Sequence, residues 1–180
     1  MKRCKWCNLN NIKYVEYHDY EWGIINTDDN YLFEMLILET FQAGLSWECV
    51  LNKRKYFKEA FDNFDIDKIC HYDEAKVNEL LCNKDIIRNK LKIKSTIGNS
   101  NIFKKIQNEY GSFYNYIKSF THGKIIYEND KTVNSLSDTL SADLKKRGMR
   151  FVGSTIIYSY LQAIGVIYSH DNDCFLYKSN

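Results

Sequence analysis

A length of 180 residues fits a single domain covering 1–180, and a composition of 44% hydrophobic and 15% aromatic residues excludes a disordered chain. The formal net charge of +2 gives no indication of nucleic-acid binding by itself, and no apolar run is long enough to span a membrane. The chain has no proline and 8 glycines, which favours helices joined by short loops, so we predict an all-α fold.

The first strong helical pattern covers residues 28–42. Thr27-Asp28-Asp29 supplies an N-cap and an acidic first turn, and apolar residues then recur at helical spacing. Gly44-Leu45-Ser46 interrupts this pattern and caps a second helix at 46–61. We therefore expect an interhelical turn with Gly44-Leu45 at its tip.

Further helices are predicted along the rest of the chain, without an internal repeat or a long linker. A long apolar pattern from Ile86 predicts a helix over 86–108, which follows a shorter one at 73–82. This pair resembles a helix-hairpin-helix element at about 73–108. The remaining segments are predicted as helices at 66–71, 112–120, 138–147 with Gly148 as its stop, and 154–168, and as a loop at 122–136.

Four residues near the two ends of the chain could form a metal site. Cys4 and His18 lie near the N-terminus, and His170-x-x-x-Cys174 lies near the C-terminus. Two cysteines and two histidines can complete a zinc tetrahedron, which would fasten the terminal segments, about 1–22 and 166–180, to each other.

The spacing of these four residues leaves alternatives open. Cys4-x-x-Cys7 is itself a metal-type spacing, Asp171 and Asp173 offer oxygen ligands, and unrelated cysteines and histidines are equally compatible with the pattern. The six cysteines could form disulfides in a secreted protein, but the start of the chain has no signal-peptide core. We therefore expect an intracellular protein with reduced or metal-bound thiols.

Glu39 stands out within the helix predicted at 28–42. It follows Leu32 and Leu36 at the i, i+4 and i+7 positions of the apolar stripe, whereas Glu34 is expected to be solvated. A carboxyl group on an apolar face needs a hydrogen-bonding partner or a functional role. Glu39 is therefore a candidate site residue.

Several aromatic residues lie close to the candidate acid or to the candidate metal ligands in sequence: Tyr17, Trp22, Trp47 and Trp6. Taken one at a time, such residues more often belong to a hydrophobic core. Taken together, they could form a pocket that stacks on a flat ring, as proteins do with a nucleobase turned out of a duplex.

These residues belong to a longer, colinear set of motifs that covers almost the whole chain: Cys4-x-Trp6, Tyr17-His18-Asp19-x-Glu21-Trp22-Gly23, Leu32-Phe33-Glu34-Met35, Leu38-Glu39, Gln42-Ala43-Gly44-Leu45-Ser46-Trp47, Lys145-Lys146-Arg147-Gly148-x-x-Phe151-Val152-Gly153, Thr155, Tyr158, Gln162-Ala163-x-Gly165 and His170-x-x-x-Cys174. With these motifs the sequence resembles the 3-methyladenine DNA glycosylase I family.

The resemblance implies a helix-hairpin-helix glycosylase fold with one structural Zn²⁺ per chain. In the family, positions matching Cys4, His18, His170 and Cys174 hold the zinc, and Cys7 would not take part.

The resemblance also implies the composition of the base pocket. Glu39 and Tyr17 would hydrogen-bond the excised base as catalytic residues, and Trp47 would stack on it. Trp22 and Trp6 would line the wall. The Gly44-Leu45 tip would enter the DNA duplex as a wedge.

The predicted hairpin departs from the family pattern. Lys84-Asp85 stands where the family commonly has a glycine before the paired isoleucines, and Asp85 places a negative charge where a phosphate would bind. Arg88 and Lys90, together with Lys92 and Lys94, could compensate. The sugar-stabilising aspartate of other helix-hairpin-helix glycosylases has no counterpart that can be carried over.

The function implied is excision of 3-methyladenine from double-stranded alkylated DNA. The products are the free base and an abasic site, and the absence of an evident lysine nucleophile predicts a monofunctional hydrolase. We expect a cytoplasmic monomer of bacterial type that associates with the nucleoid when it acts. A zinc hydrolase with an open coordination position and a non-catalytic DNA-binding module are the alternatives.

Overall fold

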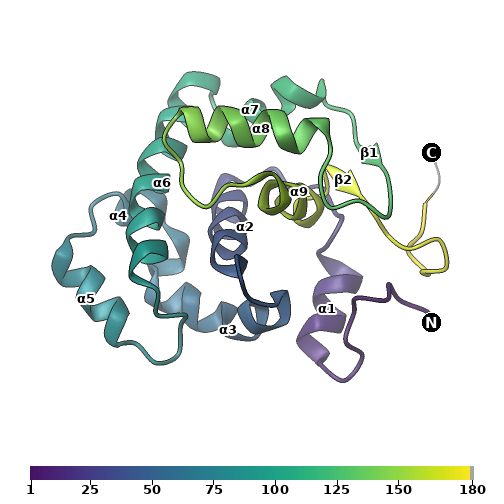
Figure 1. The fold of residues 1–180 in the computed structure, drawn as a ribbon, viewed down its shortest axis with the longest axis horizontal. Helices are drawn as coiled ribbons and strands as arrows, with labels where there is room; N and C mark the ends of the chain where they lie inside the picture. Colours follow the sequence, from purple (N-terminus) through teal and green to yellow (C-terminus); the bar gives the residue numbers. More distant parts are fainter. Residues whose placement is uncertain (179–180) are drawn as a thin grey trace.

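The computed structural model describes residues 1–178, and within that range the chain is helical apart from one short pair of strands (Figure 1). The all-α prediction is therefore confirmed. Residues 179–180, the end of the predicted 166–180 zinc segment, lie outside the described residues. The elements are α1 (Ile12–Tyr20), α2 (Asp29–Gln42), α3 (Trp47–Ala60), the 3₁₀ turn η1 (Asp62–Phe64), α4 (Ile66–Ile69), α5 (Glu74–Cys82), α6 (Lys90–Tyr110), α7 (Phe113–Thr121), β1 (Ile126–Tyr127), α8 (Ser135–Lys146), α9 (Ser154–Ala163) and β2 (Ile167–Tyr168).

Helix α2 is the centre of the core. It packs against α3, α6, α7 and α9, and every residue from Leu32 to Phe41 is buried. A helix that is apolar on nearly all sides needs such a position, because no face of it suits water. The predicted N-cap is present, since the Asp28 side chain accepts a hydrogen bond from the Tyr31 N–H at 2.8 Å.

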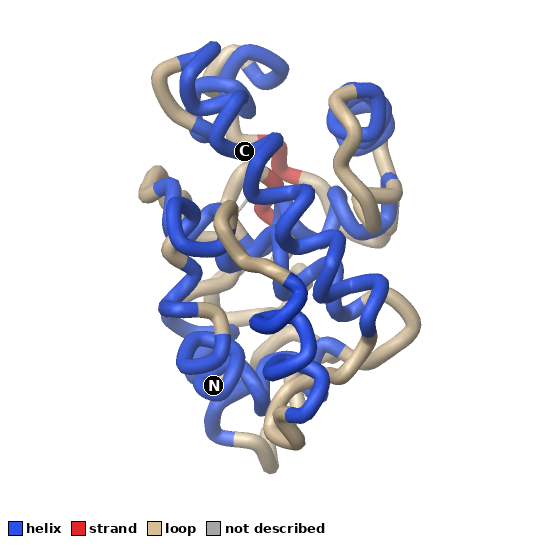
Figure 2. The backbone as a smooth tube through the Cα atoms, turned by 90° about the vertical axis from the view of Figure 1, so that its left-hand side faces the viewer, coloured by secondary structure: helices blue, strands red, loops and turns tan. Residues whose placement is uncertain are grey.

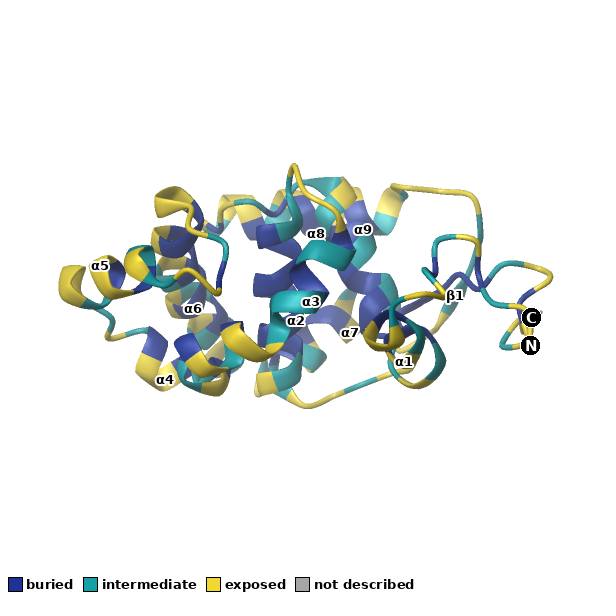
Figure 3. Cartoon of the chain, turned by 90° about the horizontal axis from the view of Figure 1, so that it is seen from below, coloured by how far each residue is buried: buried dark blue, intermediate teal, exposed yellow. Residues whose placement is uncertain are grey.

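The helices spread the molecule along one axis. Helices α4, α5 and α6 form one end, whose outer surface is exposed, and the segments before α1 and after β2 lie at the other end (Figures 1 and 3). Figure 2 shows the molecule turned by 90°, with the helices joined by loops and one short pair of strands. Within the described range no helix is both long and apolar enough to cross a membrane.

The chain after α9 differs from the prediction. A helix was expected to run to residue 168 and 122–136 to be a loop, but α9 ends at Ala163, and β2 pairs in parallel with β1. Gly165 causes the change of direction, because its φ of +79° is left-handed. The chain then runs alongside β1, with Ile126 opposite Ile167.

Two helices begin at different residues from those predicted, because asparagine caps fix their starts. Helix α6 begins at Lys90 rather than 86, since the Asn89 side chain accepts from the N–H groups of Leu91 and Lys92. Helix α8 begins at Ser135 rather than 138, since Asn134 forms a capping box there. The expected stop after α8 is present, as Gly148 has a φ of +103°.

Two further features were not predicted. Helix α1 is absent from the sequence analysis, although it carries Tyr17 and His18 on its buried face. Glu34 was expected to be solvated but is buried, where it accepts from Arg54 Nε at 2.7 Å and pairs with Lys58 at 3.1 Å. Both partners come from α3, so this prediction was wrong because it considered α2 alone.

Replacement of Gly165 by alanine should destabilise the protein. A Cβ atom there would lie 2.3 Å from the backbone of Ile24 and Ile25, in addition to the left-handed φ. We expect a loss of about 2 kcal/mol or more in the free energy of unfolding, measured by urea denaturation. Gly98→Ala is the matched control, because its Cβ meets open space within α6; it should be neutral or stabilising, and an equal loss in both variants would contradict this explanation.

Candidate functional site

The predicted acid and aromatic residues line one cavity of about 300 Å³. Its walls come from the segment before α1, from α1 and the turn after it, from α2, α3 and α9, and from the loop before α8 and the segment after β2, so residues distant in sequence meet around it. All five predicted pocket residues are there, together with eight that the sequence analysis did not name for this role. The lining residues are Trp6, Tyr14, Tyr17, Trp22, Glu39, Gln42, Trp47, Asp130, Lys131, Ser159, Gln162, Ser169 and Asp171.

Aromatic rings make up one side of this cavity. The ring centroids of Trp6 and Trp22 lie 4.8 Å apart at 68°, and those of Tyr17 and Trp47 lie 5.3 Å apart. Tyr14 packs edge-on against Trp6 at 5.3 Å. Edge-on contacts of this kind fix the rings in place and leave aromatic faces for a flat ligand.

Two buried polar groups in the cavity wall have no partner within the protein. Glu39 is 3% exposed, and its Oε2 atom and the indole N–H of Trp47 make no hydrogen bond with any of residues 1–178. Buried polar atoms are nearly always paired in native proteins, so such orphans in a cavity indicate the place of a polar ligand.

Burial also sets the protonation of the pocket. It raises the pKa of the Glu39 carboxyl to about 8, because the charged form loses its hydration. The pKa of Tyr17 is raised well above its ordinary value, first by burial and then by the nearby Glu39 carboxyl. At neutral pH the empty pocket therefore holds a phenol O–H and a carboxyl group that is mostly protonated.

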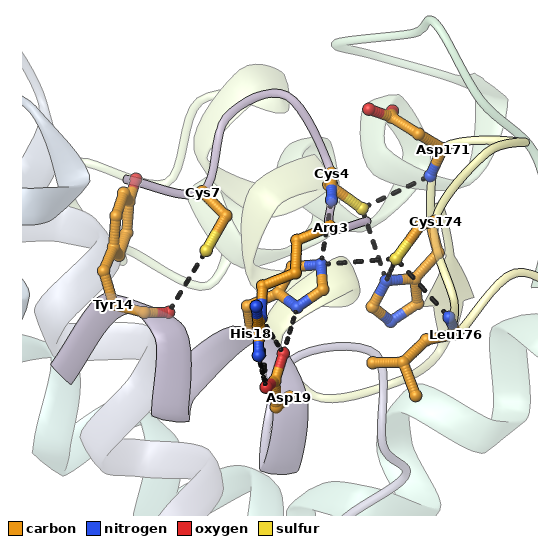
Figure 4. Close-up of polar contacts among 10 residues, drawn as sticks. Arg3, Cys4, Cys7, Tyr14, His18, Asp19, Asp171, Cys174 and Leu176 are labelled. Atoms are coloured by element: carbon orange, nitrogen blue, oxygen red, sulfur yellow. Dashed lines mark hydrogen bonds and ion pairs between the residues drawn. The ribbon is translucent and has the colours of Figure 1, made fainter. Parts of the chain in front are cut away.

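The four predicted metal ligands lie together and come from the segment before α1, from α1 and from the segment after β2 (Figure 4). All four are buried, and one potential ligand atom from each falls within 4.8 Å of the others. Cys4 Sγ lies 3.4 Å from His170 Nδ1, and Cys174 Sγ lies 3.5 Å from His18 Nε2. A zinc tetrahedron with ordinary bond lengths separates sulfur and nitrogen ligands by about 3.6 Å, so the donor set fits such an ion.

The surroundings of the cluster also suit a metal. The second ring nitrogen of His18 contacts Asp19 at 2.8 Å, and Arg3 binds the same carboxylate, a pairing that orients metal-bound histidines. Burial, and then the neighbouring His18, lower the pKa of His170 to about 4, which keeps that imidazole neutral and able to act as a ligand. Backbone N–H groups of Asp171 and Leu176 point at the two sulfur atoms.

The alternative ligands are engaged elsewhere. The Cys7 thiol contacts the Tyr14 carbonyl oxygen at 3.8 Å and does not belong to the cluster. The Asp171 carboxylate accepts from the Lys5 N–H at 2.8 Å, and Asp173 pairs with Lys2. The structure thus selects one of the ligand sets that the spacing left open.

The metal cluster and the cavity share a wall. The Trp22 ring packs on His170 with centroids 4.8 Å apart, and Trp6 packs on His18 at 5.2 Å. Order in the cluster is therefore transmitted directly to two rings that line the cavity.

The other predicted DNA-binding residues lie outside the cavity. Leu45 is 44% exposed at the turn after α2, and a Cβ atom on Gly44 would meet open space. Arg88 and Lys90 are exposed where the segment between α5 and α6 leads into α6. Lys94 is exposed and pairs with Glu74 at 2.9 Å.

Lys92 does not fit the expectation that it compensates for Asp85. Its side chain is buried, 5% exposed, and its Nζ atom binds backbone carbonyls instead of facing solvent. That part of the sequence interpretation was wrong, because the register of α6 turns Lys92 toward α2.

The fold is helical, and its aromatic cavity contains an acid without a partner among residues 1–178 and lies beside a Cys₂His₂ cluster. These features are those of a protein that binds a flat, polar ring such as a nucleobase. The family model described as methyladenine glycosylase matches residues 6–177. The chain belongs to the methyladenine glycosylase family.

Individual relatives match over their full length. DNA-3-methyladenine glycosylase 1 of Escherichia coli (strain K12) is 39% identical, with 100% of this chain and 99% of that protein covered. A crystal structure of 3-methyladenine DNA glycosylase I superposes with a TM-score of 0.94 at 39% identity, covering 98% of this chain and 100% of that chain. A tyrosine-to-phenylalanine variant of such an enzyme, solved in complex with 3-methyladenine, has a TM-score of 0.93 at 30% identity, with both chains covered to 100%.

Metal content should depend on Cys174 but not on Cys7. We expect Cys174→Ser to lose most bound metal and to lower the melting temperature, because one sulfur ligand of the tetrahedron is replaced. Cys7→Ser is the control: its thiol is buried nearby but lies outside the cluster, so metal content should not change. Elemental analysis of protein expressed with zinc available measures both, and equal metal in the two variants would refute the ligand assignment.

Proposed function

We propose that Glu39 and Tyr17 hold and activate the base in this enzyme and that Trp47 stacks on it, with Trp22 and Trp6 as the wall. The chain is a DNA repair glycosylase that hydrolyses the N-glycosidic bond of 3-methyladenine in alkylated DNA, releasing the free base and leaving an abasic site. These residue roles are supported by two polar atoms in the wall of the aromatic cavity, Glu39 Oε2 and Trp47 Nε1, which have no hydrogen-bond partner among residues 1–178.

The chemistry of the substrate explains why this pocket is sufficient. Methylation at N3 gives adenine a delocalised positive charge, so the base leaves as a neutral molecule and needs no general acid. The enzyme must extrude the base, desolvate it, and place negative charge near the sugar cation that develops as the bond breaks. Glu39 can accept a hydrogen bond from the exocyclic amine of the base, while Tyr17 binds another polar edge.

The raised pKa of Glu39 suits this role. In the empty cavity the carboxyl is mostly neutral at pH 7, because burial raises its pKa to about 8. A cationic base beside it favours the ionised form, since opposite charges stabilise each other in a site without water. As the bond breaks, positive charge moves from the base to the sugar, and the carboxylate remains to stabilise it. Water then adds to the sugar carbon and releases a proton.

The enzyme is a monofunctional hydrolase. Lys131 is the one lysine among residues 1–178 that lines the cavity, and it is exposed and paired with Glu128 at 2.7 Å. A nucleophilic lysine needs a lowered pKa in a desolvated site, which this position does not offer.

The metal in the cluster is proposed to be one structural Zn²⁺ per chain. Cys4, His18, His170 and Cys174 would use all four positions of a tetrahedral ion and leave none for a water molecule. Such an ion stabilises the fold and supplies no nucleophile, which argues against a zinc hydrolase.

The DNA-binding surface is proposed to combine a wedge and a hairpin. Leu45, with Gly44 before it, would fill the gap left by the flipped nucleotide in double-stranded DNA. The α5–α6 pair would act as the helix-hairpin-helix element, with Arg88 and Lys90 facing the phosphates. Support comes from the exposure of Leu45 and of both cations.

The remaining expectations concern the organisation of the protein. We propose one domain, acting as a monomer in the cytoplasm and on nucleoid DNA. The cavity and the metal cluster are each formed within one chain, which supports a monomer.

Glu39→Gln should keep the fold and slow excision by about 10- to 1000-fold, because the amide preserves the shape but removes the charge that stabilises the sugar cation. Single-turnover release of 3-methyladenine from methylated DNA measures the rate. Trp47→Ala is the comparison, since lost stacking should weaken base binding as well as the rate. Unchanged excision by folded Glu39→Gln protein would remove Glu39 from the mechanism.

The same variant should be more stable than the natural protein at high pH. The native state holds the Glu39 proton up to a pKa of about 8, whereas the ordinary value is 4.5, so the stability that this proton contributes is full below pH 4.5 and is lost as the pH rises from there to about 8. The advantage of Glu39→Gln in urea denaturation should therefore be larger at pH 8 than at pH 5. Glu59→Gln, at an exposed position on α3, should show no such pH dependence. If Glu39→Gln shows no pH dependence either, the burial argument is contradicted.

Leu45→Ala should weaken binding to lesion-containing duplex DNA and leave the affinity for free 3-methyladenine intact, because only the duplex needs a wedge. Fluorescence titration with each ligand separates the two effects. Leu9→Ala is the control, as Leu9 is also exposed but lies outside the turn. Equal loss of both affinities, or loss of neither, would rule out the wedge.

A further inference from the structure

The turn that presents Leu45 has a defined geometry. Ala43 has φ −48° and ψ 113°, and Gly44 has φ +81°. The Leu45 N–H donates to the Gln42 carbonyl oxygen at 2.6 Å, which closes a type II turn with glycine at its left-handed position. Ser46 then caps α3 by accepting from the Cys49 N–H. The tip is therefore a short rigid connection between two helices.

A lysine from a distant part of the sequence holds this turn. Lys92 lies on α6, and its Nζ donates to the carbonyl oxygens of Phe41 at 2.8 Å and of Ala43 at 2.6 Å. These are carbonyls at the C-terminal end of α2, where a helix leaves such groups without partners and where a positive charge is favourable. The Phe151 ring lies 6.0 Å from the same ammonium.

Lys92 caps the end of α2 although its charge is buried. Lys92 is 5% exposed, and no salt bridge joins it to a carboxylate in the part of the chain that the structure describes. Burial lowers its pKa, which shows that the ammonium is disfavoured there relative to water. A methionine of similar length would avoid the cost of burying the charge but would leave the Phe41 and Ala43 carbonyls without this donor.

Lys92 connects the 42–45 turn to the part of α6 that lies next to Arg88 and Lys90, the proposed phosphate contacts. Asn89 caps α6 through the N–H groups of Leu91 and Lys92, so the register of Lys92 is fixed by the cap. Arg88 and Lys90 are exposed next to that cap. The start of α6 therefore has Arg88 and Lys90 exposed to solvent and Lys92 bound to the 42–45 turn.

We propose that Lys92 is a positioning residue that fixes the 42–45 turn on the start of α6, so that Leu45 enters the duplex in register with the phosphate contacts. This inference rests on the proposed wedge role of Leu45. Lys92 itself touches neither the base nor the DNA backbone.

Lys92→Met and its control Lys94→Met test the proposal. For Lys92→Met we expect affinity for lesion-containing duplex to fall about 10- to 100-fold, because a displaced Leu45 would no longer fill the gap left by the flipped nucleotide. The affinity for free 3-methyladenine should not change, and amide hydrogen exchange in the 42–46 segment should increase. Lys94→Met removes an exposed charge two residues away and should leave that exchange unchanged. Unchanged duplex affinity in Lys92→Met, or weaker binding of the free base, would overturn the proposal.

Salt dependence separates positioning from direct phosphate contact. Lys90→Met, which removes a proposed phosphate contact, should reduce the slope of log affinity against log salt concentration by about 0.9. Lys92→Met should leave the slope unchanged, because a buried ammonium releases no counterions. A reduced slope in Lys92→Met would assign it a phosphate contact and overturn the positioning role.

A double-mutant cycle distinguishes failure of this proposal from failure of the wedge. If Lys92 acts through the turn, Lys92→Met should add little to the loss caused by Leu45→Ala. Additive losses would refute the Lys92 proposal and leave the wedge intact. No loss in Leu45→Ala alone would refute the wedge and, with it, the inference about Lys92.

Lys92→Gln is the second variant, in case methionine prevents folding. Its amide retains N–H donors without the charge, and we expect an intermediate loss of duplex affinity with free-base binding intact. If neither variant folds, Lys92 is required by the fold itself, and the positioning role is refuted.

Discussion

The burial of α2 on every side is the constraint on which both the pocket and the turn depend. Because no face of this helix meets water, the Glu39 carboxyl on it is desolvated, and its pKa is raised to about 8. The same helix ends at the turn with Leu45 at its tip, where Lys92 satisfies its last carbonyls. Helix α2 therefore fixes both the burial of Glu39 and the position of Leu45 relative to it.

The Cys4, His18, His170 and Cys174 cluster joins two segments that have little regular structure. Residues before α1 and after β2 form turns rather than helices, and they approach each other at the end of the molecule opposite α5 (Figure 1). Packing alone gives such segments little stability, because they bury few apolar side chains. The proposed zinc ion would close a tetrahedron across them and fix His18 and His170, which pack on the Trp6 and Trp22 rings that line the cavity.

Local patterns in the sequence identify much of this fold and site, and non-local contacts account for the rest. Glu39 could be predicted because its position on an apolar stripe depends only on helical periodicity. Helix α1 could not, because its buried face consists of Tyr14, Tyr17 and His18, which do not form an aliphatic stripe. The change of direction at Gly165 and the burial of Lys92 depend on contacts with backbone that is distant in sequence. Local sequence patterns do not reveal such contacts.

In the proposed mechanism, the burial of Glu39 makes the pocket favour a cationic base. A neutral carboxyl in a dry aromatic cavity gains little from ordinary adenine, whose flipped state loses base pairing without gaining an ion pair. An N3-methylated adenine brings a positive charge that stabilises the ionised form of Glu39 and also weakens the glycosidic bond. Binding and bond cleavage thus depend on the same charge. A more exposed acid would stay ionised with any base. The desolvation of Glu39 lowers the stability of the fold, but it also allows the pocket to distinguish the charged lesion from a neutral base.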